Sequence, residues 1–389
     1  MLIESRYPKI LIVIIICSIA ASFLLSLFAL QIFTAALFLM WIFDKNKQKL
    51  KAFDLFGLFI ILFLVVRVLS ILFSQFPDES NQAYLKEVLF YVGFFALNYY
   101  LKSLEKKQIN YIIAFFVAIG VIVALIGIVQ FNLKLVHRAQ SITSGYATFS
   151  NYLLVVLAFL LTNDFSFLKK YEKPIWYVSI VVVLTGIALA MGRMDTFLGG
   201  AIYIFIMIVK KRGFIRIAAL LIITAFISYF SIQNNKEEFT NRVQNPTSLS
   251  DRDIIYKGFF ALWDKHPFIG FGPRTFQEIF PYQDEFSDKE INQWHNDFIQ
   301  IYIESGAFAI AIYLIFIFYI LFCGIKVLKK IKSDKFSYDI VFASIIAMLG
   351  LLISSFLGGF ITSPILSVLF VFVLNLFIGE KSKFYLQKK

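Results

Sequence analysis

The chain has 389 residues, of which 59% are hydrophobic and only 16% are charged. Water-soluble domains are about half apolar and about a quarter charged, so this composition and the mean hydropathy of +0.78 exclude a soluble globular protein and predict a surface covered by lipid. Cys17 and Cys323 both lie in apolar runs, which argues against a disulfide framework and against a thiolate metal site.

About twelve apolar segments are predicted to cross a membrane as helices, since one crossing takes about 20 apolar residues. Residues 9–43 are almost entirely apolar and too long for one span, which predicts a hairpin of two that is retained and not removed as a signal peptide. The other predicted spans lie approximately at 52–74, 84–101, 110–131, 146–163, 175–192, 195–210, 214–232, 305–328, 338–358 and 362–379. The sequence therefore predicts an all-α polytopic membrane protein with about twelve transmembrane helices.

The loops between these segments alternate in charge. Every second loop is rich in lysine, and these loops hold Lys45, Lys47, Lys49 and Lys51; Lys102, Lys106 and Lys107; Lys169, Lys170 and Lys173; Lys210, Lys211 and Arg212; and Lys326, Lys329, Lys330, Lys332 and Lys335. Because Lys and Arg collect in cytoplasmic loops, these loops and both termini are predicted to be cytoplasmic. The net charge of +12 then reflects membrane topology and argues against a nucleic-acid partner.

One long hydrophilic segment, residues 233–304, falls on the outer side and interrupts this alternation. It divides the chain into an N-terminal membrane region (1–232, nine predicted spans), the large loop (233–304) and a C-terminal membrane region (305–389, three predicted spans and a tail). Long loops on a rigid scaffold commonly carry binding and chemistry. Two of the three histidines and two of the four tryptophans lie in this loop.

Two arginines are placed unusually in the N-terminal region. Arg193 lies at the outer end of one predicted span, where it either snorkels to the interface, pairs with Asp195, or offers a fixed cation to an anionic lipid head group. Arg67 lies inside the third predicted span, where a charge is costly. It either snorkels to the outer surface or faces a protein partner, a polar cavity or a lipid phosphate.

The large loop contains a segment that predicts a helix followed by a turn. Residues 252–264, which begin with Arg252, have apolar residues at helical spacing. Pro267 is expected to end this helix, and the two glycines of the segment 266–274 (His-Pro-Phe-Ile-Gly-Phe-Gly-Pro-Arg) allow a tight turn. No predicted strand precedes this Gly-x-Gly, which argues against a dinucleotide site.

The end of the large loop predicts an amphipathic helix at the membrane surface. Its apolar residues lie at positions 291, 294, 298 and 301, and His295 lies beside this stripe. A lone histidine there is either a structural residue or a base that accepts a proton from a hydroxyl nucleophile. The spacing of His and Cys residues predicts no metal site, and no cofactor is predicted.

Taken together, these residues resemble the O-antigen ligase and polymerase superfamily of bacterial membrane enzymes. The resemblance rests on Arg252 with the tryptophan that follows it, on the His-Pro-x-x-Gly-x-Gly-Pro segment at 266–273, and on the segment 295–306, which runs from His-Asn-Asp-Phe to Glu-Ser-Gly. Arg193 at the mouth of a span agrees with it as well. The motif covers residues 250–310, and the remainder agrees in the number and order of spans.

The resemblance implies a GT-C-like glycosyltransferase of the bacterial inner membrane with its active site on the periplasmic side. Its donor would be a glycan on undecaprenyl diphosphate, its acceptor a hydroxyl of lipid A–core, and membrane lipid would surround it. Arg193 and Arg252 would hold the diphosphate and stabilise its charge as it leaves, without a metal ion. His295 would orient or deprotonate the acceptor hydroxyl, giving inversion at the anomeric carbon. Arg274 and Arg67 are further candidates for diphosphate binding that the family pattern itself does not supply.

Three alternatives stay open from the sequence. A polymerase would pass the glycan to another carrier-linked glycan, and a related transferase would pass it to protein. A transporter for the lipid-linked glycan belongs to a different class. Transporters usually have internal repeats and short outer loops, whereas this chain has no evident repeat and one large outer loop.

Overall fold

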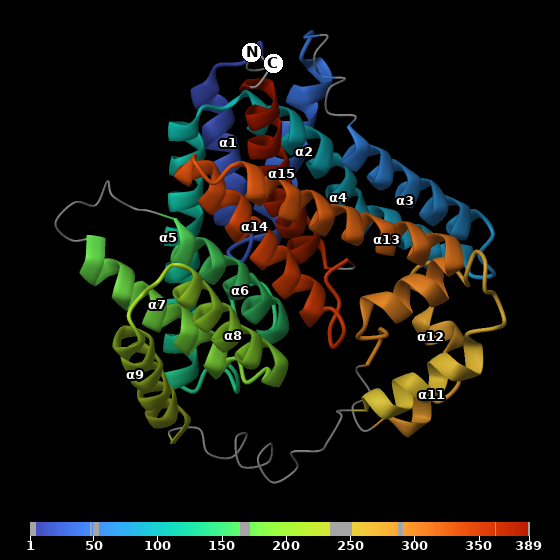
Figure 1. Ribbon diagram of the computed structural model, residues 1–389. Helices are drawn as coiled ribbons and strands as arrows, with labels where there is room; N and C mark the ends of the chain where they lie inside the picture. Colours follow the sequence, from blue (N-terminus) through green and yellow to red (C-terminus); the bar gives the residue numbers. More distant parts are fainter. Residues whose placement is uncertain are drawn as a thin grey trace.

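All the regular secondary structure is helical in the part of the chain that the computed structural model describes, residues 5–46, 49, 54–163, 172–233, 251–286, 291–361 and 363–387 (Figure 1). The predicted all-α class is confirmed. The helices in chain order are α1 (Lys9–Ser22), α2 (Leu27–Phe43), α3 (Leu55–Leu72), α4 (Pro77–Ser103), α5 (Lys106–Asn132), α6 (Tyr146–Thr162), α7 (Glu172–Leu189), α8 (Arg193–Val209), α9 (Phe214–Gln233), α11 (Arg252–Leu262), α12 (Phe276–Ile279), the short 3-10 helix Gln283–Glu285, α13 (Asp297–Lys330), α14 (Lys335–Ser354) and α15 (Pro364–Gln387).

Each predicted span coincides with a helix, and the apolar segment 9–43 divides into α1 and α2. Six of the described helices are long and apolar enough to cross a membrane: α3, α5, α9, α13, α14 and α15. The helices α1, α2, α6 and α7 are also apolar, but their described parts have only 10–17 residues, fewer than the roughly 20 that a perpendicular crossing takes. The helices are therefore observed, while the count of about twelve spans stays a prediction.

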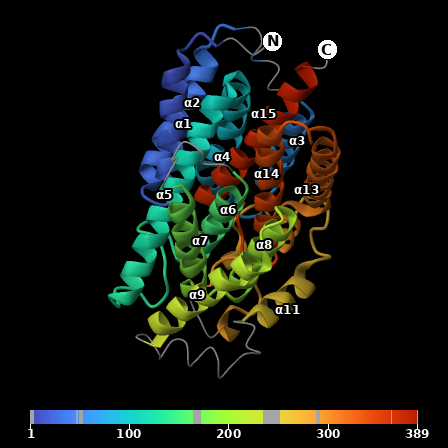
Figure 2. The same cartoon turned by 60° about the vertical axis from the view of Figure 1, so that its left-hand side comes forward.

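The centre of the bundle is formed by α6, α14 and α15, which Figure 2 shows between α1, α2 and α5 on one side and α3 and α13 on the other. Every residue of α6 from Phe149 to Thr162 is buried, as is 89% of the most apolar window of α15. A helix that is apolar on all sides is stable when other helices surround it. The rim differs, because α9 exposes Phe214 and Ile215 at 82% and 83%, an outer surface suited to lipid.

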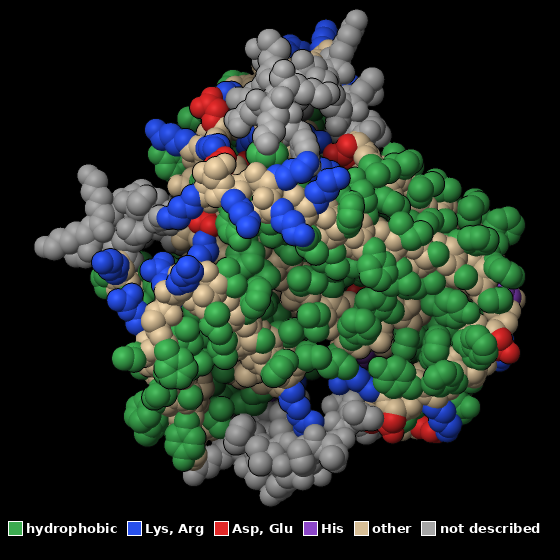
Figure 3. All heavy atoms as spheres, viewed as in Figure 1, with side chains coloured by type: hydrophobic (Ala, Val, Ile, Leu, Met, Phe, Trp, Pro, Cys, Tyr) green, Lys and Arg blue, Asp and Glu red, His purple; other side chains and the backbone are tan. Residues whose placement is uncertain are grey.

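The two ends of the bundle differ in composition. Both termini lie at one end, and α11 and α12 lie towards the other (Figures 1 and 2). Lys and Arg side chains gather towards the end with the termini, while hydrophobic side chains cover most of the rest of the face in Figure 3. This separation of charge is the one that the predicted topology requires.

The large loop has a hydrophobic cluster of its own. Residues 234–250 and 287–290 of the predicted loop lie outside the described residues. The others pack around Ile255, Leu262, Phe271, Phe276, Phe280, Phe286, Ile291, Trp294, Ile299 and Ile303. The helix α11 begins at Arg252 as predicted but ends at Leu262, so Pro267 does not terminate it and belongs to the turn that follows.

The amphipathic helix predicted from position 291 begins later, at Asp297. Its N-cap is Asn296, whose side chain accepts hydrogen bonds from the Phe298 and Ile299 N–H groups, and His295 has a left-handed φ of 47° that a helix cannot contain. The apolar residues at 291 and 294 instead belong to the hydrophobic cluster of the loop. The prediction of a helix before the membrane span is correct only from Asp297 onward.

The helix α13 is broken at Gly306, which has φ 76° and ψ −174°. The turn 267–272 fills the break. The Pro267 carbonyl accepts from the Ala307 N–H at 2.7 Å, and the Phe271 and Gly272 N–H groups donate to carbonyls 303 and 304, each at 2.9 Å. A Cβ at position 306 would overlap the Phe268 carbonyl, so only glycine fits there. Two motif segments that are distant in the sequence thus form one unit.

Candidate functional site

A cavity of about 710 Å³ lies where the large loop meets the ends of three central helices. Its walls come from the N-terminal ends of α6 and α8, the start of α11, the segment 291–295, and the connection between α14 and α15. Arg193, Arg252 and His295 all line it. The structure therefore brings together three residues that the sequence singled out separately.

Arg193 is the first residue of α8, and Gly192 is its N-cap. The buried Asp195, two residues further along α8, accepts hydrogen bonds from the Ser150 hydroxyl of α6 and, at 2.8 Å, from the Ser354 hydroxyl of α14. This carboxylate joins the ends of three helices and fixes where α8 begins. The guanidinium of Arg193 is thereby held at the cavity wall.

Arg252 lines the same cavity from a different element, as the first residue of α11. Its Nη2 donates to the Leu357 carbonyl at 2.5 Å. Burial lowers the pKa of the Arg252 guanidinium below its ordinary value, and the neighbouring Arg193 lowers it further. An arginine remains protonated despite such a shift. Two guanidiniums therefore lie near each other in a wall that also contains the carboxylates of Asp195 and Asp251. Paired guanidiniums suit an anionic ligand such as a phosphate.

His295 is held between two anchored neighbours. Trp294 is completely buried in the hydrophobic cluster of the loop, and the Asn296 amide donates to the Phe356 carbonyl at 3.1 Å. The Nδ1 atom of His295 lies 3.5 Å from Nε2 of Gln293. The left-handed backbone at His295 is unusual for a residue other than glycine, and such conformations concentrate at functional sites.

The connection between α14 and α15 completes the wall of the cavity, and the buried Asp297 holds this connection in place. The Asp297 N–H donates to the Ser355 carbonyl, and the Asp297 carboxylate accepts from the Phe360 N–H, each at 3.0 Å. Leu357, Gly358 and Gly359 line the cavity. No residue of this connection was predicted to be functional, although the Gly-Gly pair between two apolar segments indicates a turn.

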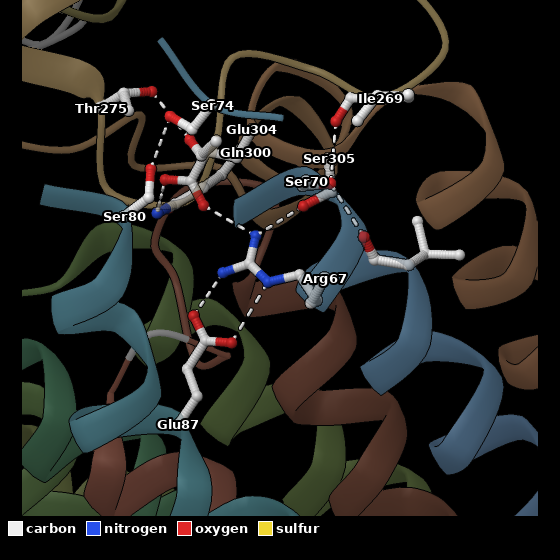
Figure 4. A network of polar contacts seen from close by, with 12 residues as sticks. Arg67, Ser70, Ser74, Ser80, Glu87, Ile269, Thr275, Gln300, Glu304 and Ser305 are labelled. Atoms are coloured by element: carbon white, nitrogen blue, oxygen red, sulfur yellow. Dashed lines mark hydrogen bonds and ion pairs between the residues drawn. The ribbon is translucent and has the colours of Figure 1, made fainter. Parts of the chain in front are cut away.

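Arg67 does not reach this cavity. Its side chain is 3% exposed and pairs with Glu87 of α4 and, at 2.9 Å, with Glu304 of α13 (Figure 4). It also donates to the Ser305 hydroxyl at 2.9 Å. Of the interpretations left open for Arg67, the structure supports a protein partner. Its predicted contact with the donor diphosphate stays a prediction that these hydrogen bonds do not support. Glu87, a charge within an apolar helix, could have been recognised as that partner.

Arg274 lies at a different pocket, of about 370 Å³, together with Glu79, Gln82 and Glu304. Burial lowers the pKa of its guanidinium, an effect opposed by the nearby Glu87 and Glu304 carboxylates. Gln293 lines both this pocket and the larger cavity. Arg274 thus lines a different pocket from Arg193 and Arg252, and its predicted contact with the diphosphate stays a prediction.

The polar side chains that line the larger cavity are two guanidiniums, an imidazole, the carboxylates of Asp195 and Asp251, and hydroxyl and amide groups. Among the residues whose positions are described, no three His, Cys, Asp or Glu side chains form a group able to hold a metal ion. Such a cavity can bind a doubly charged anion and place a base beside it.

Residues 174–314 match a family model described as O-antigen ligase. The matched region extends from α7 into α13 and contains Arg193, Arg252 and His295. A search of curated proteins found no match. The family match confirms the resemblance to the O-antigen ligase superfamily that the motif in the large loop indicates.

Proposed function

We propose that this chain is a membrane glycosyltransferase that moves a glycan from undecaprenyl diphosphate to a hydroxyl of lipid A–core, on the periplasmic side of the bacterial inner membrane. The observation that carries the proposal is the convergence of Arg193, Arg252 and His295 on one cavity. The family match supports the ligase or polymerase class, and the helices of span length support a membrane location.

The two arginines suit the donor. A sugar diphosphate carries two or more negative charges, and a guanidinium binds phosphate oxygens through paired N–H donors. Arg193 and Arg252 approach the cavity from different elements, so together they can hold both phosphates. Their charge stabilises the negative charge that develops on the leaving diphosphate, which is electrostatic catalysis without a metal ion.

His295 suits the acceptor. In the proposed step, the acceptor hydroxyl gives its proton to the imidazole of His295, and its oxygen forms a bond to the anomeric carbon. The bond from that carbon to the diphosphate oxygen breaks, and the diphosphate leaves with the electron pair. Attack on the face opposite the leaving group inverts the anomeric configuration. The proton and the glycan are both accounted for without a covalent enzyme intermediate.

The test is transfer by the purified protein in proteoliposomes, with lipid-linked glycan and lipid A–core, in the presence of a divalent-metal chelator. A glycan–lipid A–core product supports the ligase reading, and a longer glycan on the carrier, formed without lipid A–core, would replace it by the polymerase alternative. Transfer to protein would identify the third reaction class. Movement of the glycan across the bilayer with no covalent product would contradict an enzyme altogether.

The site is tested by Arg252→Ala and His295→Ala. Loss of an electrostatic contact to the transition state lowers the rate about a hundredfold to a thousandfold, and removal of the base has a comparable effect. Lys257→Ala on the exposed side of α11 and His137→Ala on an exposed loop are matched controls for loss of a cation and of an imidazole. Full activity in both site variants would refute the assignment.

A further inference from the structure

A second charged cavity, of about 490 Å³, lies at the opposite ends of the same central helices. It is lined by the C-terminal end of α6, the end of α8 and the start of α14, whereas the Arg193 cavity uses the N-terminal ends of α6 and α8 and the C-terminal end of α14. The 17 residues of α6 separate the two by about 25 Å. The two cavities are therefore distinct sites.

Five cations line this basic cavity: Lys173, Lys210, Arg212, Arg216 and Lys335. One carboxylate lines it as well, Asp339, which forms an ion pair with Lys210. Five positive charges and one negative charge leave an excess of four, gathered from the four helices α7, α9, α14 and α8 with its C-terminal turn. Like charges this close repel one another. Binding of an anion relieves this repulsion and so lowers the free energy of the protein.

A purely topological role does not account for the arrangement. Lysines of cytoplasmic loops orient a membrane protein wherever they lie, and they need not converge on a hollow. Here the guanidinium of Arg212 lies over the Trp176 ring at 5.1 Å, and the Trp176 ring is itself held by a 2.8 Å hydrogen bond from Nε1 to the Leu160 carbonyl. A stacked arginine is oriented in advance for a phosphate.

The surroundings match the level of lipid head groups. Tyr177 joins Trp176 in the wall of the basic cavity, and these two residue types are enriched where a bilayer meets water. Lys and Arg side chains gather towards this end of the molecule and border on a surface of hydrophobic side chains (Figure 3). Basic pockets between helices on the cytoplasmic side bind phosphate-bearing head groups.

We infer that the basic cavity binds the phosphate of an anionic phospholipid from the leaflet at this end of the protein. Lys173 and Arg216 form no ion pair or hydrogen bond within the part of the chain that the structure describes, so both are able to contact the phosphate. Arg212, oriented by Trp176, provides the planar pair of donors. A soluble phosphate ester offers the same chemistry, and the experiment distinguishes the two sources.

The test measures binding of a fluorescent anionic phospholipid to the purified full-length protein in neutral detergent micelles. We expect the double variant Arg212→Ala, Arg216→Ala to bind about tenfold or more weakly, since each charge-assisted contact is strong. The matched control is Lys326→Ala, Lys329→Ala, which removes two exposed cations of α13 that do not line the cavity. Arg216→Lys, which keeps the charge, should retain most of the affinity and guards against a folding defect.

Competition identifies the source of the phosphate. Displacement of the probe by unlabelled anionic phospholipid, but not by millimolar inorganic phosphate, supports a lipid head group. Equal displacement by inorganic phosphate supports the phosphate site but reassigns it to a soluble ligand. Wild-type affinity in the double alanine variant, or an equal loss in the α13 control, overturns the inference.

Discussion

Replacing Arg67 with methionine removes the cation that pairs with both Glu87 and Glu304. The side chains of these three residues are 3%, 7% and 1% exposed. Removing one partner of a buried ion pair costs about 3–5 kcal/mol, because the other charge remains buried without compensation. Two carboxylates lose their partner here, and the hydrogen bond to Ser305 is lost as well. We therefore expect Arg67→Met to lower the free energy of unfolding by at least about 3 kcal/mol.

The assay is thermal unfolding of the purified protein in detergent at neutral pH. Lys257→Met, at an exposed position of α11, is the control and should stay within about 0.5 kcal/mol of the wild type. The triple variant Arg67→Met, Glu87→Gln, Glu304→Gln contains no uncompensated charge in the network, so it should be more stable than Arg67→Met. The reasoning fails if Arg67→Met unfolds at the same temperature as the wild type. It also fails if the triple variant is no more stable than Arg67→Met.

Three further predictions concern single contacts. Gly306→Ala forces a side chain onto a left-handed backbone and against the Phe268 carbonyl, so limited proteolysis should cut the large loop faster than in the wild type; an unchanged cleavage rate would contradict this. Asp195→Ala removes the carboxylate that accepts from the buried Ser354 hydroxyl and that is one of two acceptors of the Ser150 hydroxyl. It should lower the free energy of unfolding by about 2 kcal/mol in thermal unfolding, while Asp195→Asn should cost less. Partial burial acts to raise the pKa of Asp334, but hydrogen bonds from Lys106 and Ser337 hold the pKa below its ordinary value. The stabilisation that this carboxylate gives to the folded protein is therefore complete above about pH 4. It is lost as the pH falls through the folded-state pKa. Asp334→Asn should make the melting temperature depend less on pH in that acidic range. An unchanged pH profile would show that the ion pair contributes nothing.

Features with a local cause were predictable from the sequence. The apolar runs predicted where α1 to α9 and α13 to α15 lie, because burial and lipid contact both depend on composition. The start of α11 at Arg252 followed from its helical spacing. The residues of the Arg193 cavity were identified individually, through their unusual positions and the family resemblance, and not through any pattern that shows them to be neighbours.

Features with a nonlocal cause were not predictable. The apolar spacing at 291–301 indicated a helix, but the cap at Asn296 and the left-handed His295 exclude residues 291–295 from it. The sequence leaves the partner of Arg67 open because its acceptors lie 20 and 237 residues away along the chain. Only the packing of α3 against α4 and α13 brings them together.

Arg67 acts on the Arg193 cavity from a distance, through its contacts with Glu304 and Ser305. Its network holds Glu304 and Ser305 at the C-terminal end of the helix segment 297–305. Ser70 of α3 and Ser74, just after α3, donate hydrogen bonds to the carbonyls of Ile269 and Phe271 in the turn that fills the Gly306 break (Figure 4).

The other end of that segment carries Asn296 and His295. Nine residues of helix extend about 13 Å and transmit position rigidly, so a shift at Glu304 moves His295 relative to Arg193 and Arg252. The break at Gly306 uncouples this segment from the long membrane helix that follows it. Arg67 thus anchors the segment that positions His295, the proposed base, although it does not itself line the cavity.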